Sequence, residues 1–138
     1  MFSRQEWKLV ARDALAIYLL SHLLRLLMRA PLGLPELPSV QAQLVAAALS
    51  LSFSVMCFGL VAFYTTNVVW KHLLAVAAIL WMASIAGSAV RLPAPMNVLP
   101  PSLILPLVVF PLIHYALTAS IGGYLGKMFS VHWAGSCC

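Results

Sequence analysis

Charged side chains are scarce in this chain of 138 residues, and acidic ones are nearly missing. Only 8% of the residues are Asp, Glu, Lys or Arg, and Asp and Glu together number three against eight Lys and Arg. A soluble domain is usually about 25% charged, because its surface must be solvated. The scarcity argues against a soluble globular domain and against a disordered chain. No basic cluster with interleaved aromatic residues occurs, so no nucleic-acid partner is expected.

The three carboxylates are also too dispersed for most catalytic mechanisms. Glu6 and Asp13 stand near the N-terminus, and Glu36 stands in a proline-rich stretch. The sequence carries no paired carboxylates within an apolar segment, and no HExxH, GxSxG or phosphate-loop motif. Ion-coupled transport usually uses a membrane-embedded acid, which the later apolar segments lack. The sequence therefore predicts a protein that is not an enzyme.

Cysteine is equally sparse. Cys57 lies inside an apolar run, whereas Cys137 and Cys138 end the sequence. Their spacing matches neither a zinc site nor a disulfide framework, and no N-glycosylation sequon is present. We therefore predict no metal site. Lipidation of the two final cysteines stays open.

Apolar residues, by contrast, make up 63% of the chain, and its mean hydropathy is +1.00. They form four segments, each close to the roughly 20 residues that a membrane-spanning helix requires. We therefore predict an all-α fold in a single domain: a small polytopic membrane protein with an up-down bundle of about four transmembrane helices. The expected spans are residues 10–30, 42–64, 73–90 and 102–125, followed by a short tail at 126–138.

The first segment permits an alternative, because its polar residues follow one helical face opposite a row of leucines. That pattern fits an interfacial amphipathic helix followed by three spans, or a spanning helix with a polar stripe. With four spans, five of the eight Lys and Arg are cytoplasmic; with three spans, six are. The length of the segment favours four spans with both termini in the cytoplasm. Compact loops favour a bacterial inner membrane.

Connections and small residues predict how the segments pack. The short link at 65–72 predicts that the second and third helices are antiparallel neighbours, and an up-down bundle makes the first and fourth neighbours as well. Pro106 and Pro111 predict a kink early in the fourth helix. Small residues let helices approach closely in a membrane. The predicted packing residues are Ala83, Gly87, Ala116, Ser120 and Gly123.

Two histidines are the main candidates for chemistry. His22 and His114 each stand near the middle of an apolar segment, where an ionisable residue is a candidate functional site. Across neighbouring helices they could ligate a b-type haem. The simpler interpretation of His114 is a hydrogen bond to a carbonyl, Ser or Thr in the bundle. Arg25 and Arg29, on the face of His22, could bind an anionic lipid headgroup or haem propionates, or reach out to the interface.

These observations predict a non-enzymatic accessory subunit, assembly protein or interaction protein of a membrane complex, without a cofactor. Its expected partners are the lipid bilayer and either another membrane protein or a second copy of the chain. Two alternatives stay open. One is a haem b protein that uses His22 and His114, and the other is a small oligomeric transporter or channel with Arg25 and His114 along its path.

Overall fold

The structure, a computed structural model, describes residues 3–29, 40–65, 69–89 and 105–135. Over these ranges the chain is helical and contains no strand, which confirms the predicted all-α class. There are four α-helices and one π-helical turn. They are α1 (Arg4–Arg29), α2 (Val40–Tyr64), α3 (Val69–Ala89), η1 (Leu105–Val109) and α5 (Phe110–Gly135), which continues directly from η1.

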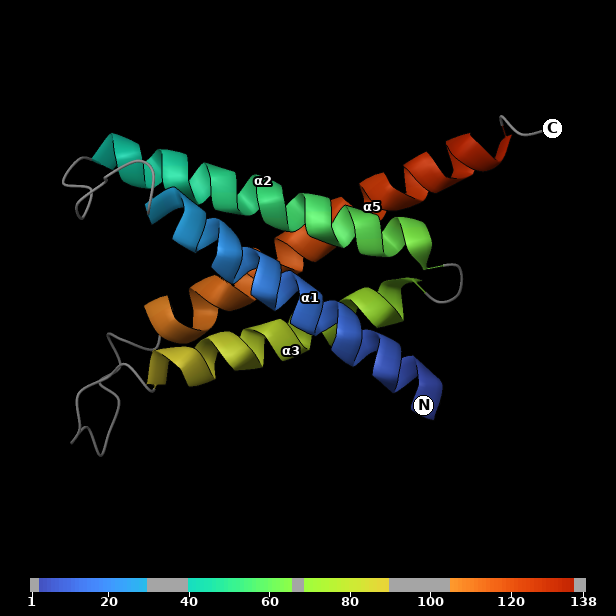
Figure 1. Ribbon diagram of the computed structural model, residues 1–138, viewed down its shortest axis with the longest axis horizontal. Coiled ribbons are helices and arrows are strands. Elements are labelled where there is room, and N and C mark those ends of the chain that lie inside the picture. Colours follow the sequence, from blue (N-terminus) through green and yellow to red (C-terminus); the bar gives the residue numbers. More distant parts are fainter. Residues whose placement is uncertain (1–2, 30–39, 66–68, 90–104, 136–138) are drawn as a thin grey trace.

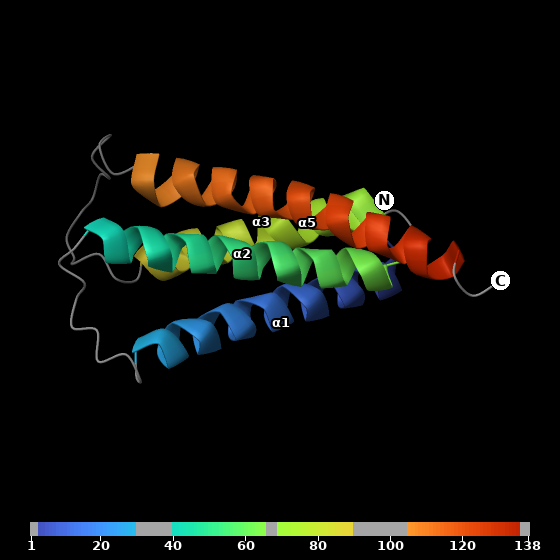
Figure 2. The same cartoon turned by 90° about the horizontal axis from the view of Figure 1, so that it is seen from above.

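The helices run in alternating directions (Figures 1 and 2). α1 and α3 begin at the end of the bundle where α2 and α5 finish, and we call this the terminal end. The other we call the far end. The start of α1 and the end of α5 therefore lie at the same end of the molecule, as the up-down prediction requires.

Neighbour relations differ from the prediction. α2 packs most extensively on α5, and α1 lies mainly on α3. Within the described residues α1 and α5 do not contact each other, and Figure 2 shows them on opposite sides of the bundle. The prediction that the first and fourth helices are neighbours is therefore wrong. α2 and α3, although joined by a short link, contact each other only sparingly.

Glycine explains this arrangement, because it lets two parallel helices, α2 and α5, come closest. A Cβ on Gly122 would lie 2.8 Å from the Cβ of Phe58 on α2. A Cβ on Gly126 would lie 2.8 Å from the Cβ of Ala62 and nearer still to the carbonyl oxygen of Gly59. Small residues at a crossing allow backbones to approach where a larger side chain would hold them apart. Close contact between α2 and α5 thus moves α1 and α3 to the flanks.

The hydrophobic core fills the half of the bundle nearer the terminal end. α1 faces it with a narrow row formed by Val10, Ala14 and Ile17, while its leucine row points outward, with Leu15 58% exposed. The predicted leucine face of α1 is thus an outer surface. The remaining core comes from the other three helices, and its members include Phe58, Ala62, Leu73, Val76, Leu80 and Ala119.

Helix boundaries extend beyond the predicted spans. α1 begins at Arg4 because Ser3 and Glu6 form a capping box: the Ser3 N–H donates to the Glu6 carboxylate, and the Glu6 N–H donates to Ser3 Oγ at 3.2 Å. Hydrogen bonds from the Ser3 backbone and then its side chain lower the pKa of Glu6. α5 continues to Gly135, through much of the segment predicted as a tail.

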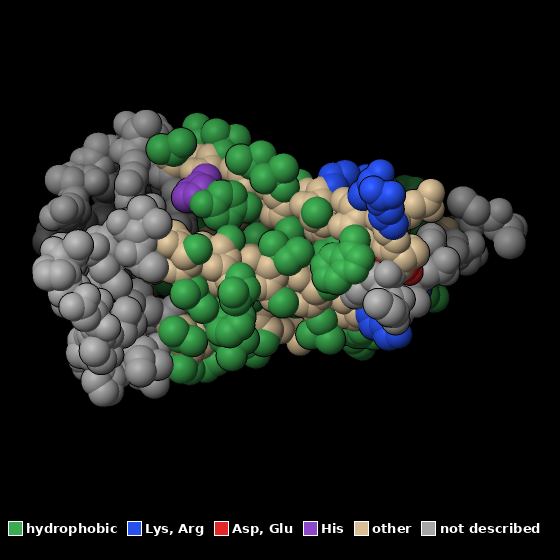
Figure 3. All heavy atoms as spheres, turned by 90° about the horizontal axis from the view of Figure 1, so that it is seen from below, with side chains coloured by type: hydrophobic (Ala, Val, Ile, Leu, Met, Phe, Trp, Pro, Cys, Tyr) green, Lys and Arg blue, Asp and Glu red, His purple; other side chains and the backbone are tan. Residues whose placement is uncertain are grey.

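Two helices are long and apolar enough to cross a membrane among the residues that the structure describes: Leu44–Tyr64 in α2 and Val69–Ser88 in α3. Large hydrophobic side chains are nonetheless exposed on all four helices. In Figure 3 they cover the flank of the bundle, and Lys and Arg side chains gather toward the terminal end.

Candidate functional site

A polar cavity of about 430 Å³ lies between the helices, on the far-end side of the core. All four helices and η1 contribute to its wall. Its lining is rich in hydroxyl and imidazole groups, whereas the outer faces of the same helices are largely apolar. The lining residues are Tyr18, Ser21, His22, Ala47, Ser50, Ser54, Leu80, Ala83, Ser84, Gly87, Ser88, Pro106, Phe110, Pro111, His114 and Tyr115.

The cavity exists because small residues line it and α1 stays apart from α5. Ala83 and Gly87, which the sequence analysis assigned to helix packing, both border the cavity. A Cβ on Gly87 would meet no atom within 4 Å, whereas one on Gly126 would overlap α2. The same bundle is therefore tightly closed on one side of the core and open on the other.

His114 projects into this cavity from α5. Its Nε2 lies 3.3 Å from Ser54 Oγ on α2. Ser54 Oγ also donates to the Ser50 carbonyl at 2.9 Å, so its hydrogen is already engaged. His114 Nε2 is therefore the donor in the contact with Ser54. A serine in the bundle is the kind of partner that the simpler interpretation of His114 anticipated.

His22 lines the same cavity from α1, and its ring meets the Tyr18 ring edge to face with centroids 4.6 Å apart. The two candidate histidines thus share one cavity although their helices do not touch. They reach it from opposite sides of the bundle rather than from neighbouring helices. The backbone of Arg25 and Arg29 belongs to α1, but both side chains lie outside the described part of the chain.

The cavity wall includes an irregular stretch of backbone at η1. Pro106 and Pro111 border the cavity here, where the sequence predicts a kink, and the helix widens into a π-turn. The indole of Trp81 on α3 donates to the Val108 carbonyl at 3.0 Å. Pro111 has no N–H, so one carbonyl a turn earlier loses its helical donor. Such backbone is tolerated at membrane depth where it lines a cavity.

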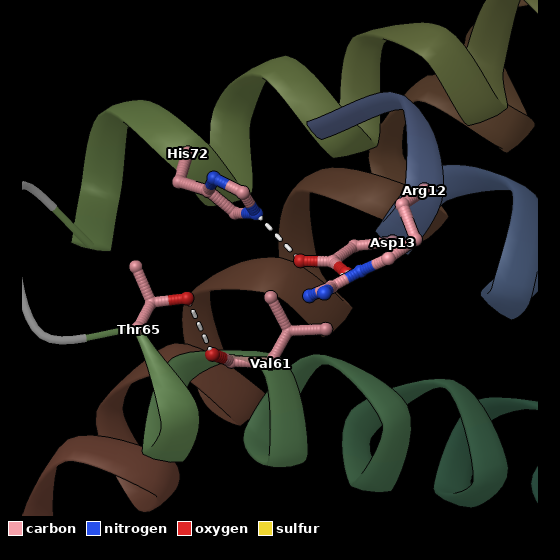
Figure 4. Close-up of polar contacts among 5 residues, drawn as sticks. All are labelled: Arg12, Asp13, Val61, Thr65 and His72. Carbon is pink, nitrogen blue, oxygen red and sulfur yellow. Dashed lines mark hydrogen bonds and ion pairs between the residues drawn. The ribbon is translucent and has the colours of Figure 1, made fainter. Parts of the chain in front are cut away.

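A second polar cluster lies near the terminal end and joins α1 to α3 (Figure 4). Asp13 Oδ2 lies 2.9 Å from His72 Nε2, and the two side chains are only 13% and 8% exposed. Arg12 Nη2 reaches Asp13 Oδ1 at 2.8 Å, with its own side chain 70% exposed. An acid inside the bundle is therefore satisfied on both oxygens, one toward α3 and one toward the surface.

The sequence analysis missed this pair. Asp13 was considered only as a carboxylate near the N-terminus, and His72 falls within the link at 65–72. The available signal was spacing, because Val10, Asp13, Ala14 and Ile17 follow the i, i+3, i+4, i+7 pattern of one helix face. The row of Val10, Ala14 and Ile17, rather than the row of leucines, marked the inner face.

The predicted packing residues on α5 have mixed positions. Ala116 and Ser120 are exposed, and Ser120 Oγ donates to the Ala116 carbonyl at 2.8 Å. A Cβ on Gly123 would lie 2.6 Å from Leu73 Cδ1 on α3, so this glycine is at a helix contact. The tightest glycine contacts belong to Gly122 and Gly126, which are not among the predicted packing residues although their GxxxG spacing is typical of a close helix contact.

Chemically, the cavity offers hydroxyl and imidazole groups for hydrogen bonding. Besides Ser54, Ser84 Oγ donates to its own helix, at the Trp81 carbonyl, so both serines present oxygen lone pairs as acceptors. In the described part of the chain, no group of three or more His, Cys, Asp or Glu side chains is placed to hold a metal ion.

Comparisons with models of known protein families, with curated proteins and with solved structures found no match to this chain.

Proposed function

We propose that this chain is a small integral membrane protein that spans the bilayer four times and acts by binding a small ligand in its cavity. It works without catalysis of its own, as an accessory or assembly protein of a membrane complex. The cavity between the helices carries this proposal. At about 430 Å³, it falls within the usual range of roughly 300–1,000 Å³ for small-molecule sites.

Four spans are favoured by an aromatic and basic belt at the terminal end. Each helix contributes at least one exposed Trp or Tyr there: Trp7, Tyr64, Trp70, Tyr124 and Trp133. Trp and Tyr concentrate at membrane interfaces because one end of each ring is apolar and the other is polar. A belt that all four helices share fits four helices crossing at one interface better than three helices with one lying flat.

Asp13 also favours insertion of α1. An unpaired carboxylate inside a bilayer is costly, and intramembrane acids generally pair within the bundle. The 2.9 Å contact with His72 supplies that partner. Leucines on the outward face of α1, such as Leu19 at 57% exposed, then meet lipid.

Exposed cations set the orientation. Five lie toward the terminal end: Arg4, Lys8, Arg12, Lys71 and Lys127. Lys and Arg accumulate on the cytoplasmic side of inner-membrane proteins. We therefore propose a bacterial inner-membrane location with the terminal end in the cytoplasm and the cavity toward the outer half of the bilayer. Phe58, Leu73 and Val76, each almost fully buried, close the bundle on the cytoplasmic side of the cavity.

Cysteine accessibility tests this proposal with two adjacent positions. In a background with Cys57, Cys137 and Cys138 replaced by serine, Ser50→Cys places a thiol in the cavity. Leu51→Cys, one residue on, places it on the outer face, where Leu51 is 40% exposed. We expect a small impermeant thiol reagent, added to spheroplasts, to label Ser50→Cys and to spare Leu51→Cys because lipid covers it. Equal labelling of both positions would contradict the membrane-embedded cavity.

A haem b protein is the second candidate function, and one observation favours it: His22 and His114 line a single cavity from opposite helices. Axial ligation would draw both imidazoles onto one iron. Purified protein mixed with haem should then show a sharp Soret band, and both His22→Ala and His114→Ala should abolish it. An unchanged spectrum of free haem would remove this candidate.

A further inference from the structure

We propose that the ligand of this cavity is a quinone or quinol headgroup, held between His22 on α1 and His114 on α5. This inference rests on the proposed function, since it names the ligand class of that same cavity. It draws on three properties of the lining: its charge, its hydrogen-bonding groups and its ring-shaped side chains.

Charge comes first. Among the described side chains that line the cavity there is no carboxylate, lysine or arginine. A charged ligand would meet no opposite charge among these side chains, so they give its charge no ionic partner. The described part of the lining therefore favours an uncharged molecule.

The hydrogen-bonding groups stand on opposite walls. His114 Nε2 already acts as a donor, and its 3.3 Å contact with Ser54 is long enough to be exchanged for a better acceptor. His22 faces the same space from the diagonal helix. A ring with an oxygen at each of two opposite positions presents a hydrogen-bonding group to each of the two walls. The carbonyls of a quinone accept from imidazole N–H groups, and the hydroxyls of a quinol donate to the serine oxygens.

Part of the remaining wall is aromatic or aliphatic. Tyr18, Phe110 and Tyr115 bring aromatic rings from two helices, and Leu80 adds an aliphatic surface. Aromatic side chains pack well against a flat ring in offset or edge-to-face geometry. A quinone also dissolves in the hydrocarbon of a bilayer, so it can reach a cavity in a bundle whose outer faces are apolar.

Binding of decylubiquinone to the full chain in nanodiscs tests the proposal. Tryptophan fluorescence provides the signal, since Trp81 lies beside the cavity residue Leu80 and bonds to η1. We expect saturable quenching that empty discs with added free tryptophan do not show. His114→Leu and His22→Leu should each weaken binding about tenfold, as expected for one lost buried donor. His114→Gln retains an N–H donor and should bind within about threefold of the original chain.

Ser120→Ala is the matched control, because Ser120 is exposed on the same helix and bonds only to the Ala116 carbonyl. It should bind decylubiquinone unchanged, and the circular dichroism of each variant should confirm its helical fold. Equal affinity in the two leucine variants and the control overturns the quinone assignment. So does equal binding of decylbenzene, which lacks the oxygens, measured by its competition with decylubiquinone.

The outcomes separate this inference from the function on which it rests. If Ser50→Cys is labelled while Leu51→Cys is spared, but decylubiquinone does not bind, the cavity remains and the quinone assignment fails. If the reagent labels Ser50→Cys and Leu51→Cys equally, both proposals fail. If haem binds with a Soret band that needs both histidines and excludes decylubiquinone, the occupant is haem and the quinone assignment is again wrong.

Discussion

Four glycines allow the packing of the bundle to be tested with a single type of substitution. Gly87, Gly59, Gly122 and Gly126 are all helical, but their surroundings range from empty to overfilled. Replacing glycine by alanine within a helix lowers the entropy lost on folding and is worth roughly 0.5–1 kcal/mol where space permits. The same added methyl in a filled position costs roughly 1–3 kcal/mol. The space around each glycine therefore decides whether its replacement by alanine stabilises or destabilises the protein.

Gly126→Ala should destabilise the protein. Its Cβ would overlap the Gly59 carbonyl oxygen and lie 2.8 Å from Ala62 Cβ, and neither a backbone atom nor a Cβ can rotate away. The helices α2 and α5 must therefore separate. After the intrinsic gain is offset, we expect a net loss of about 1–2 kcal/mol. Gly87→Ala, with no atom within 4 Å, should be neutral or stabilising by up to about 0.5 kcal/mol.

Unfolding in mixed micelles of increasing SDS fraction, followed by circular dichroism, measures both variants. Gly59→Ala provides an intermediate case, because its Cβ would sit 3.4 Å from the Gly122 carbonyl, an ordinary contact. The expected order of stability is therefore Gly87→Ala, then Gly59→Ala, then Gly126→Ala. If Gly126→Ala unfolds at the same SDS fraction as Gly87→Ala, the close approach of α2 and α5 is refuted.

Three further predictions concern single contacts. His72→Leu should cost about 2 kcal/mol, since it removes a hydrogen bond to the buried Asp13 carboxylate, and the same SDS titration should place it well below Lys71→Leu, an exposed neighbour. The pKa of Glu6 is lowered in the fold from its ordinary value of 4.5. The cap therefore stabilises α1 at pH values above 4.5, and this stabilisation is lost as the pH falls through the lowered pKa. Amide protons in the first turn should then exchange faster on acidification, and Glu6→Gln should remove that pH dependence. Trp81→Phe removes the donor to Val108 and should raise amide exchange in η1, where an unchanged rate would show that the indole does not hold the turn.

Composition and helix periodicity predict much of this fold. Apolar segments with breaks at proline indicate four helices, and the structure has four α-helices over its described ranges. Helix ends were less predictable, since local hydrogen bonds determine them. Ser3 and Glu6 start α1 well before its apolar stretch, and α5 continues past Leu125 because nothing from Gly126 to Gly135 breaks a helix.

Neighbour relations were harder to predict than elements. Link length favours pairing α2 with α3, but the depth of contact is set by how closely two backbones can approach. Gly59 and Gly126 let the backbones of α2 and α5 approach so closely that a Cβ on Gly126 would overlap the Gly59 carbonyl oxygen. A regular up-down bundle predicts that the first and fourth helices are neighbours, whereas the GxxxG spacing on α5 indicates a close helix contact, which α5 makes with α2. The register of one helix on the next depends on such contacts, which the hydropathy pattern does not record.

The candidate site shows the same division. His22 and His114 were identifiable because each interrupts an apolar segment, and the structure brings both to one cavity. Their shared position follows from a diagonal arrangement that the sequence analysis did not foresee. Asp13 and His72 were missed because each was judged by its place along the chain, whereas their partnership depends on α1 lying along α3.

The packing of the bundle also accounts for where its two polar features lie, the Asp13–His72 pair and the cavity. The half of the bundle near the terminal end is sealed by glycine contacts and a filled core, and Asp13 and His72 are hydrogen-bonded to each other there. In the other half, α1 and α5 lie diagonally opposite each other and do not contact. Small residues leave space there, and hydroxyl and imidazole groups line it. A rigid half that fixes the helices lets the open half keep its shape without being filled. The proposed binding therefore depends on the helix arrangement, and a variant that loosens the Gly126 contact should weaken decylubiquinone binding although Gly126 does not line the cavity.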